Sequence, residues 1–403
     1  MATAGSLEAL RELNRLRVID ALRQRGTASR SEIARHTGLS RTTVTTLVSD
    51  LQARGLVVEQ PLGEVQGRGR PPILLRLDPS AGAVVGIHFD HRQLRVAVAD
   101  LSSTVLAEKW QGLDVDRAAE EALDAAAELV SVVIAAAGIE MSRIVGAGVA
   151  LAGPVSRDGT VGSTVILPGW EGLNAVDELS RRLDLQVAVD NDANLGALAE
   201  VSFGTGRGLS DVIYIMVSSG IGAGIVIGGR LHRGVTGLAG EIGHVRARAD
   251  GAVCRCGNRG CLETVASADA ILSLLRPTHG AGLNVRGLVE LLDAGDAGAH
   301  RVVNDAGREI GRVVAGLCNI LSPAGVIVGG DLGLAAEPLL AGIREALDRY
   351  ALPPVRAAIE LKAGVLGERA EVLGALALVI GDTDRLRSAG LVAVRELSLK
   401  AVN

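Results

Sequence analysis

Residues 29–57 read SRSEIARHTGLSRTTVTTLVSDLQARGLV, and this stretch predicts two short helices separated by a tight turn. Gly38 supplies the turn, and Ser40 is a suitable N-cap for the second helix. In that helix the apolar residues repeat at the spacing i, i+3, i+4, i+7, at Val44, Leu47, Val48 and Leu51. A helix, a tight turn and a second helix form the unit that lays its second helix in the major groove of DNA.

The flanking segments extend this unit to a winged helix-turn-helix domain over residues 1–80. A longer helix is expected over 6–25, and the first helix of the central unit over 30–37. Two strands at 56–58 and 73–77 are joined by a loop with the sequence GEVQGRGRPP. Such a hairpin, rich in Gly and Arg at its tip, is typical of the wing of a DNA-binding domain.

The start of the helix that follows Ser40 presents hydrogen-bonding side chains, which we take as candidate DNA contacts: Ser40, Arg41, Thr42, Thr43 and Thr45. Arg41 can bind a guanine edge with two hydrogen bonds, and threonines suit phosphates or a thymine methyl group. In the wing loop, Arg68 and Arg70 alternate with glycines, a shape that fits a narrow minor groove. The alternative is a generic three-helix bundle with a solvated basic face.

Charge is divided unevenly along the 403 residues. Residues 1–80 hold twelve arginines and eight acidic residues, a net charge of +4, so the remainder carries −9. A basic head on an acidic body indicates one domain for nucleic acid and one for another ligand. The first residues contain no apolar run typical of a signal peptide, and no stretch has the character of a membrane span. We therefore expect a cytoplasmic protein.

From residue 81 onward, strand-like apolar runs alternate with alanine-rich helical stretches. The strand-like runs are 83–89, 94–99, 144–151, 187–190, 212–217, 223–227 and 325–328. The main helical stretches are 117–137, 172–183, 193–202, 267–275 and 302–321. This alternation predicts α/β layering with mixed sheets.

Three of the four cysteines fall within eight positions, at Cys254, Cys256 and Cys261, and His244 precedes them. Three thiolates and one imidazole form a tetrahedral donor set suited to Zn²⁺, and four protein ligands leave no position open for catalysis. The spacing therefore predicts a structural zinc site. The alternative is a group of buried or disulfide-prone cysteines with an unrelated histidine. Cys318 lies on an apolar helix face, and we expect it in the core.

Two sets of motifs resemble the ROK family, named for repressor, open reading frame and kinase. Residues 29–57 followed by GRGRPPILLRLDP (67–79) resemble the DNA-binding half of its repressors. GEIGH (240–244) followed by CRCGNRGCLE (254–263) resembles the zinc signature of the family. The resemblance covers nearly the whole chain, and its motifs are specific.

The fold implied by this resemblance is a two-lobed, actin-like sugar-kinase domain over residues 81–403, behind the winged helix-turn-helix. The small lobe is expected over about 81–195, together with a C-terminal helix at about 385–403. The large lobe is expected over about 196–384.

A sugar site around the sequence DNDAN (190–194) is also implied by the resemblance. Asp192 stands where the kinases of the family have their general base, here expected to be a vestigial one. The implied sugar contacts are Gly153, Asn191, Asp192, Glu241, His244 and Glu263. Ile166 stands where the family usually has Asn before Leu-Pro-Gly-Trp, so we expect the ligand to lose a polar contact and to differ from glucose.

ATP use in this superfamily needs a phosphate loop, Asp-x-Gly-Gly-Thr-Lys, directly after the opening strand. The equivalent residues here are HFDHRQ (88–93), in which His88 replaces the aspartate and Asp90 places a carboxylate where phosphate would lie. A second glycine-rich loop (218–224) and the pair Gly329-Gly330 remain, and we expect them to serve packing. Without the first loop, charge neutralisation and positioning fail, so the sequence predicts a protein that is not an enzyme.

These observations predict a transcriptional regulator, more specifically a repressor of carbohydrate genes, that binds operator DNA as a homodimer or homotetramer. A sugar or sugar phosphate is expected to bind between the lobes and change the spacing of the DNA heads. One alternative is an active ATP-dependent sugar kinase with an appended DNA-binding domain. Another is a regulator whose C-terminal domain responds to a protein partner and whose sugar pocket is vestigial.

Overall fold

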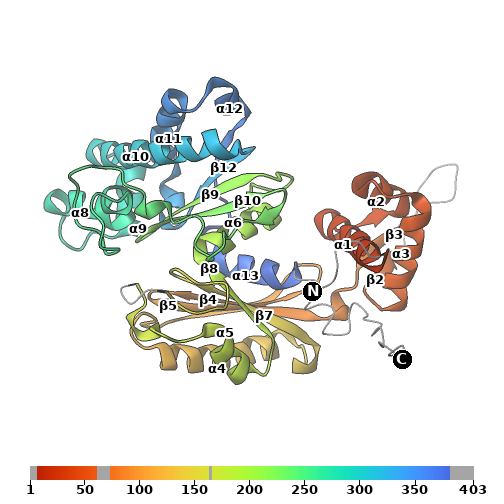
Figure 1. The fold of residues 1–403 in the computed structure, drawn as a ribbon. Helices are drawn as coiled ribbons and strands as arrows, with labels where there is room; N and C mark the ends of the chain where they lie inside the picture. The colour runs from red at the N-terminus through yellow and green to blue at the C-terminus, as the bar shows by residue number, and fades with distance from the viewer. Residues whose placement is uncertain (1–6, 61–72, 163–165, 382–403) are drawn as a thin grey trace, which may run out of the picture.

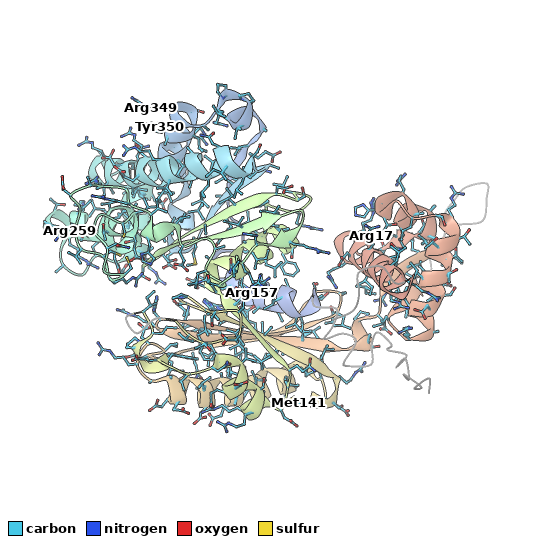
Figure 2. The ribbon with its side chains drawn as sticks, viewed as in Figure 1. Arg17, Met141, Arg157, Arg259, Arg349 and Tyr350 are labelled. Atoms are coloured by element: carbon cyan, nitrogen blue, oxygen red, sulfur yellow. The ribbon has the colours of Figure 1, made fainter. Side chains whose placement is uncertain are left out.

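The computed structural model describes residues 7–60, 73–162 and 166–381. They form a small helical head and two larger lobes, each lobe built on a five-stranded sheet (Figure 1). Apolar side chains fill the layers between the sheets and their helices (Figure 2). Among the described residues, no helix combines the length and the apolar character needed to cross a membrane.

The head contains the predicted helices and strands in the predicted order, together with one short strand that was not predicted, at Ala28–Ser29. It consists of α1 (Leu7–Arg25), β1 (Ala28–Ser29), α2 (Arg30–Thr37), α3 (Arg41–Ala53), β2 (Val57–Gln60) and β3 (Leu74–Leu77). Gly38 ends α2 with a φ of 70°, a left-handed conformation that glycine adopts without strain. Val44, Leu47, Val48 and Leu51 are all buried, as their spacing predicts, so the opposite face of α3 is left to solvent.

The first lobe holds three antiparallel strands, β4 to β6, extended by two parallel strands, in the order β6-β5-β4-β7-β8. The strands are β4 (Ala83–Asp90), β5 (Gln93–Asp100), β6 (Val105–Gly112), β7 (Ile144–Leu151) and β8 (Val187–Asn191). Helices α4 (Ala119–Ala137) and α5 (Ala175–Leu183) cover one face of this sheet (Figure 1). Both sheet faces are covered, which explains why β4 and β7 are apolar along their length.

The second lobe repeats the same strand order, β11-β10-β9-β12-β13. Its strands are β9 (Val212–Val217), β10 (Ile221–Ile227), β11 (Arg230–Leu231), β12 (Gly325–Gly329) and β13 (Glu360–Ala363). One face is packed by α8 (Ala268–His279), α9 (Val285–Asp293), α10 (Ala297–Leu321) and α11 (Ala336–Tyr350). The chain therefore contains a topological duplication that shows no fixed period in its sequence.

Two helices lie where the lobes meet, α6 (Asp192–Phe203) and α13 (Ala370–Ile380) (Figure 1). They pack on each other; α6 also packs on β9 and β10, and α13 on β4 and β7. Residues 196–384 are predicted for the large lobe, and within that range α13 packs its apolar side chains on the sheet of the first lobe. The helix expected at about 385–403 lies outside the described residues.

The head rests against the first lobe rather than standing apart from it. Buried residues of α1 and the head strands share one apolar cluster with Val84, Ala97 and α13. Within this contact, Nη2 of Arg23 donates to the backbone oxygen of Ile380 at 3.1 Å. Because that oxygen is at the last residue of α13, the contact joins the first helix of the head to the end of the helix between the lobes.

Candidate functional site

The segment that carries Glu241 and His244 lies directly on β10. The amide of Ala223 donates to the oxygen of Gly240 at 2.8 Å, and Gly240 has a φ of 101°. A Cβ on Gly240 would stand 1.9 Å from the oxygen of Ala223, so only glycine permits this approach. The conformation fixes Glu241 and His244 at the edge of the second lobe.

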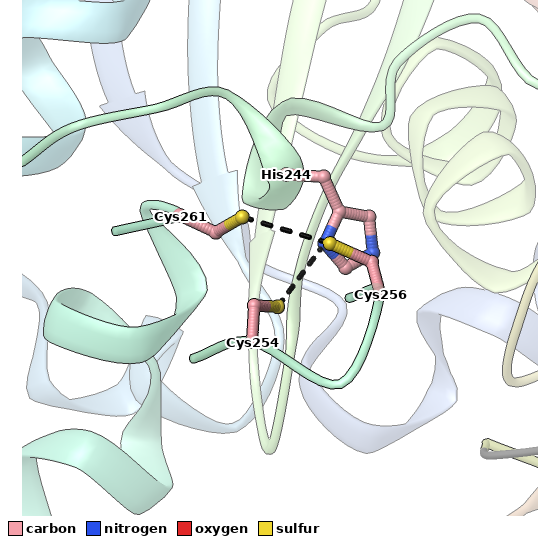
Figure 3. A group of neighbouring side chains, drawn as sticks. All are labelled: His244, Cys254, Cys256 and Cys261. Atoms are coloured by element: carbon pink, nitrogen blue, oxygen red, sulfur yellow. Dashed lines mark hydrogen bonds between the residues drawn. The ribbon is translucent and has the colours of Figure 1, made fainter. Parts of the chain in front are cut away.

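His244, Cys254, Cys256 and Cys261 converge as predicted, with ligand atoms that all lie within 4.8 Å of one another (Figure 3). Nδ1 of His244 lies 3.6 Å from Sγ of Cys254, and the Sγ atoms of Cys256 and Cys261 are 3.7 Å apart. Four ligands around a zinc ion, with Zn–S bonds of about 2.3 Å, lie roughly 3.8 Å apart at tetrahedral angles. The cluster therefore fits a tetrahedral metal ion.

The two nitrogens of His244 face different neighbours. Nδ1 faces the thiol groups, whereas Nε2 lies 4.0 Å from Oε2 of Glu241. One imidazole can therefore serve the metal site with one nitrogen and the sugar site with the other, which agrees with its place in both predicted sets. A metal at Nδ1 would fix the orientation of the ring, as outer-shell contacts do at metal sites.

Asn191 and Asp192 lie together at the end of β8, where α6 begins. Nδ2 of Asn191 donates to the oxygen of Gly153 at 2.9 Å and to Oδ1 of Asp192 at 2.8 Å. Oδ1 of Asn191 accepts from the amides of Ala193 and Asn194 and caps α6. Burial raises the pKa of Asp192 to about 7, with Glu241 and Asp90 adding repulsion. Three predicted sugar residues are thus in direct contact.

Asp190 supports this group, a role that the sequence did not suggest. Its Oδ1 accepts from Nδ2 of Asn194 and from the amide of Asn191, each at 2.8 Å. Its Oδ2 accepts from Nε of Arg233 at 2.6 Å. Because Arg233 follows β11, this partly buried ion pair joins the first lobe to the second directly beside the predicted sugar site.

Glu263 is paired where the sequence analysis expected it to be free for a sugar. Nε and Nη2 of Arg255 donate to its two carboxylate oxygens at 2.8 and 2.6 Å. A Cβ on Gly220 would lie 2.7 Å from Nη2 of Arg255 and 2.9 Å from Oε2 of Glu263. The pair therefore covers the second glycine-rich loop. Arg255 was missed because its only signal was a position between two metal ligands.

The former phosphate loop is occupied by side chains. His88 is buried opposite Arg95 in the β4–β5 hairpin, and its Nδ1 has no hydrogen-bond partner among the described atoms. Burial lowers the pKa of His88 to about 4, so its imidazole is neutral near pH 7. Arg95 is held by Glu108 at 2.8 Å and by Glu368 at 3.3 Å. The segment that would form the phosphate loop therefore begins with a buried, neutral histidine next to a paired arginine.

The remaining glycine motifs pack against each other. A Cβ on Gly330 would lie 2.8 Å from the hydroxyl of Ser218 and from the backbone of Val217. That same hydroxyl accepts from the amide of Asp331 at 3.0 Å. The glycines thus allow two backbone segments to approach closely, and this approach explains them without a nucleotide.

The outer face of α3 is exposed, as a DNA-reading helix requires. Arg41, Thr42 and Thr45 are exposed. Ser40 caps the helix by accepting from the amide of Thr43 at 3.1 Å, and the two hydroxyls lie 2.7 Å apart. The cap leaves Arg41 as the cationic side chain at the start of the helix. The wing residues Arg68 and Arg70 lie outside the described residues.

Comparison with known proteins agrees with both halves of this description. Residues 84–382 match the ROK family, and residues 12–68 match the MarR family. The chain belongs to the ROK family. Its predicted fold class, a winged head followed by a two-lobed ROK domain, is thereby confirmed.

Relatives of known function include repressors that match more than nine tenths of this chain. The xylose repressor of Caldicellulosiruptor bescii is 29% identical over 393 residues, covering 94% of this chain and 98% of the relative. A crystal structure of a ROK family transcriptional regulator, a homologue of the E. coli Mlc protein, superposes with a TM-score of 0.77 at 26% identity, over 95% and 98% of the two chains.

A kinase structure covers a smaller share of the chain. The ROK family glucokinase from Streptomyces griseus, solved with glucose and AMPPNP, has a TM-score of 0.64 and 30% identity. It covers 74% of this chain and 99% of its own, so the full-length similarity is to the regulators and not to this enzyme.

Proposed function

We propose that this protein is a DNA-binding transcriptional repressor that responds to a sugar and does not transfer phosphate. One observation carries the proposal: the predicted sugar residues Gly153, Asn191 and Asp192 are in direct contact, while the segment that would form the phosphate loop carries a buried His88 opposite Arg95. The full-length similarity to a xylose repressor and a ROK regulator supports the same conclusion.

In this proposal α3 enters the major groove. Arg41 contacts base edges, and Ser40, Thr42, Thr43 and Thr45 contact phosphates or thymine methyl groups. Arg68 and Arg70 of the wing lie in the neighbouring minor groove. The match of residues 12–68 to the MarR family and the exposed face of α3 support this assignment.

The sugar is held between residues of both lobes. Gly153, Asn191 and Asp192 contribute from the first lobe, and Glu241, His244 and Glu263 from the second. Carboxylate, amide and imidazole groups at such a site bind sugar hydroxyls in pairs. Each carboxylate oxygen of Glu263 accepts one hydrogen bond from Arg255 and retains a lone pair, so Glu263 can accept a sugar hydroxyl while Arg255 holds it in place.

Zn²⁺ is the metal we assign to His244, Cys254, Cys256 and Cys261. It would be structural, because four protein ligands complete a tetrahedron. Bound there, it would hold the segment of Glu241 and the segment of Glu263 in one orientation. The metal thereby supports the sugar contacts without taking part in chemistry.

Two copies of the chain bind a palindromic operator, each α3 in one half-site about one helical turn of DNA from the other. A homodimer is sufficient for this geometry, and a homotetramer would use two such pairs. Sugar changes operator affinity only as far as it prefers one arrangement of the lobes over the other.

The test begins by selecting an operator from a random duplex pool with the full-length protein. Fluorescence anisotropy then measures operator affinity with and without each of a panel of pentoses, hexoses and their phosphates. We expect at least one compound to lower operator affinity, and the Asp192→Asn variant to bind the operator and ignore that compound. ATP consumption above the level of Asp192→Asn would instead support a kinase, and constant operator affinity across the panel would count against a sugar effector.

A further inference from the structure

The predicted sugar site is rich in carboxyl groups. Asp90 and Glu241 act electrostatically on Asp192, and Asp192, Asp331 and Asp90 act on Glu371. Asp192 and Glu371 are buried, with 9% and 7% of their surface exposed. These acids come from β4, α6, α13 and the segments after β11 and β12, so both lobes contribute them.

The surroundings of Asp192 and Glu371 disfavour negative charge. Burial raises the pKa of Glu371 to about 8, and the neighbouring carboxylates of Asp192, Asp331 and Asp90 add to the effect. Near pH 7, Glu371 is therefore largely neutral, and Asp192 is divided between its two forms. A group that holds its proton against bulk water is in surroundings that disfavour anions.

Three basic side chains near the site are each paired with an acidic side chain. Arg233 is paired with Asp190 at 2.6 Å, and Arg255 holds both oxygens of Glu263. His91, the base that acts on Asp192, lies 2.7 Å from Asp116. A phosphate group would have to break one of these pairs, and it would leave a carboxylate uncompensated.

We infer that the effector of this repressor is an uncharged sugar and that its carboxyl groups exclude sugar phosphates. The inference rests on the proposed function and deepens it by fixing the chemical class of the ligand. A phosphate monoester is close to a dianion at pH 7, so it meets repulsion from several carboxylates, whereas hydroxyl groups can donate to the same oxygens.

Matched pairs of ligands provide the test. Isothermal calorimetry with the full-length, zinc-loaded protein measures xylose, glucose and N-acetylglucosamine against xylose 5-phosphate, glucose 6-phosphate and N-acetylglucosamine 6-phosphate. We expect a sugar that binds to do so at least about tenfold more tightly than its phosphate ester. A phosphate ester that binds as tightly as its sugar, or more tightly, overturns the inference and leaves a sugar-type effector in place. Failure of every compound removes the proposed function as well.

Two variants test the cause of the selectivity. Asp90→Asn and Asp331→Asn each remove a negative charge. Each should therefore reduce the ratio of sugar affinity to phosphate-ester affinity by about threefold or more. Asp250→Asn, on an exposed loop, is the matched control and should leave the gap unchanged. Operator binding and melting temperature show that each variant is folded. A gap that stays constant in both site variants overturns the electrostatic explanation.

One other feature could capture a phosphate. A cavity of about 580 Å³ beside the β4–β5 turn is lined by His91, Arg92, Asp114, Asp116 and Arg117, among others. Arg92 and Arg117 are exposed. A phosphate ester whose binding advantage disappears in Arg92→Ala would locate its phosphate in this cavity and overturn the inference.

Discussion

Replacing Asp192 by Asn should stabilise the protein while abolishing its response to sugar. Asp192 is buried, and its pKa of about 7 compares with an ordinary value of 3.8. Between about pH 4 and pH 7 the folded chain keeps a proton that the unfolded chain has released, so the contribution of this group to stability falls as pH rises through that window. Above pH 7, ionisation of the buried Asp192 lowers the free energy of unfolding by its full amount, which the pKa difference sets at roughly 4 kcal/mol.

Asparagine removes the ionisable group and keeps its shape. Its side-chain oxygen can still accept from Nδ2 of Asn191 and from the amide of Ala193, which now donate to Oδ1 of Asp192. We therefore expect Asp192→Asn to raise the free energy of unfolding at pH 8 by about 2 to 4 kcal/mol. At pH 5 most of this cost is absent from the native protein, so the gain should shrink by roughly 2 kcal/mol.

Urea denaturation of the full-length protein at pH 5 and pH 8 provides the assay, followed by tryptophan fluorescence. Trp170 is buried in the first lobe, so its emission reports on the part of the fold that carries β8. Asp250→Asn, an exposed charge removal, controls for the change in net charge. The reasoning is refuted if Asp192→Asn is less stable than the native protein at both pH values, or equally stabilised at both.

Three further changes test other parts of the structure. Cys256→Ser should lower bound zinc from about one ion per chain to near zero and should reduce the melting temperature. Cys318→Ala is the control and should keep its zinc. Metal analysis that finds equal zinc in both variants contradicts the proposed zinc site. Arg41→Ala should weaken operator binding by about 1 to 3 kcal/mol without lowering the melting temperature, because Arg41 is exposed; unchanged anisotropy titrations would exclude it from the interface. Arg23→Ala removes the hydrogen bond to Ile380, so calorimetry should find normal sugar affinity while the effect of sugar on operator binding declines; a full effect would show that coupling takes another route.

Most elements of the fold could be predicted because their apolar residues have a clear period. The spacing of Val44, Leu47, Val48 and Leu51 identified α3, and the continuous apolar run at 144–151 identified β7. The strand β6 (Val105–Gly112) was not predicted, since it lies at the sheet edge and exposes residues such as Trp110. An edge strand with polar residues on both faces gives no alternating pattern.

The lobe that contains α13 could not be predicted from its residues. Its sequence AEVLGALALVI is apolar on every side, which indicates burial but not the neighbour against which it is buried. The position of α13 is set by its contacts with α6 on one side and with β4 and β7 on another. These are contacts between segments more than 150 residues apart, and no local pattern encodes them.

The cluster of His244, Cys254, Cys256 and Cys261 was the most predictable part of the site, because four donor residues in a fixed spacing leave few alternatives. Partners of the sugar residues were less predictable. Arg255 holds Glu263 and Arg233 holds Asp190, yet neither arginine stands at a sequence position that marks it as the partner of that acid. Ion pairs of this kind depend on the distance between loops in the folded chain.

The contact of Arg23 with the final carbonyl of α13 limits how this protein can be re-engineered. A head taken from another regulator would bring a different first helix against Ile380, and the new surface would have to accept both that oxygen and the apolar cluster around it. Chimeras that change DNA specificity should therefore keep α1 (Leu7–Arg25) and exchange only the reading helix α3. A chimera joined near residue 80 would keep the covalent link between the two domains but would lose the contact between α1 and α13.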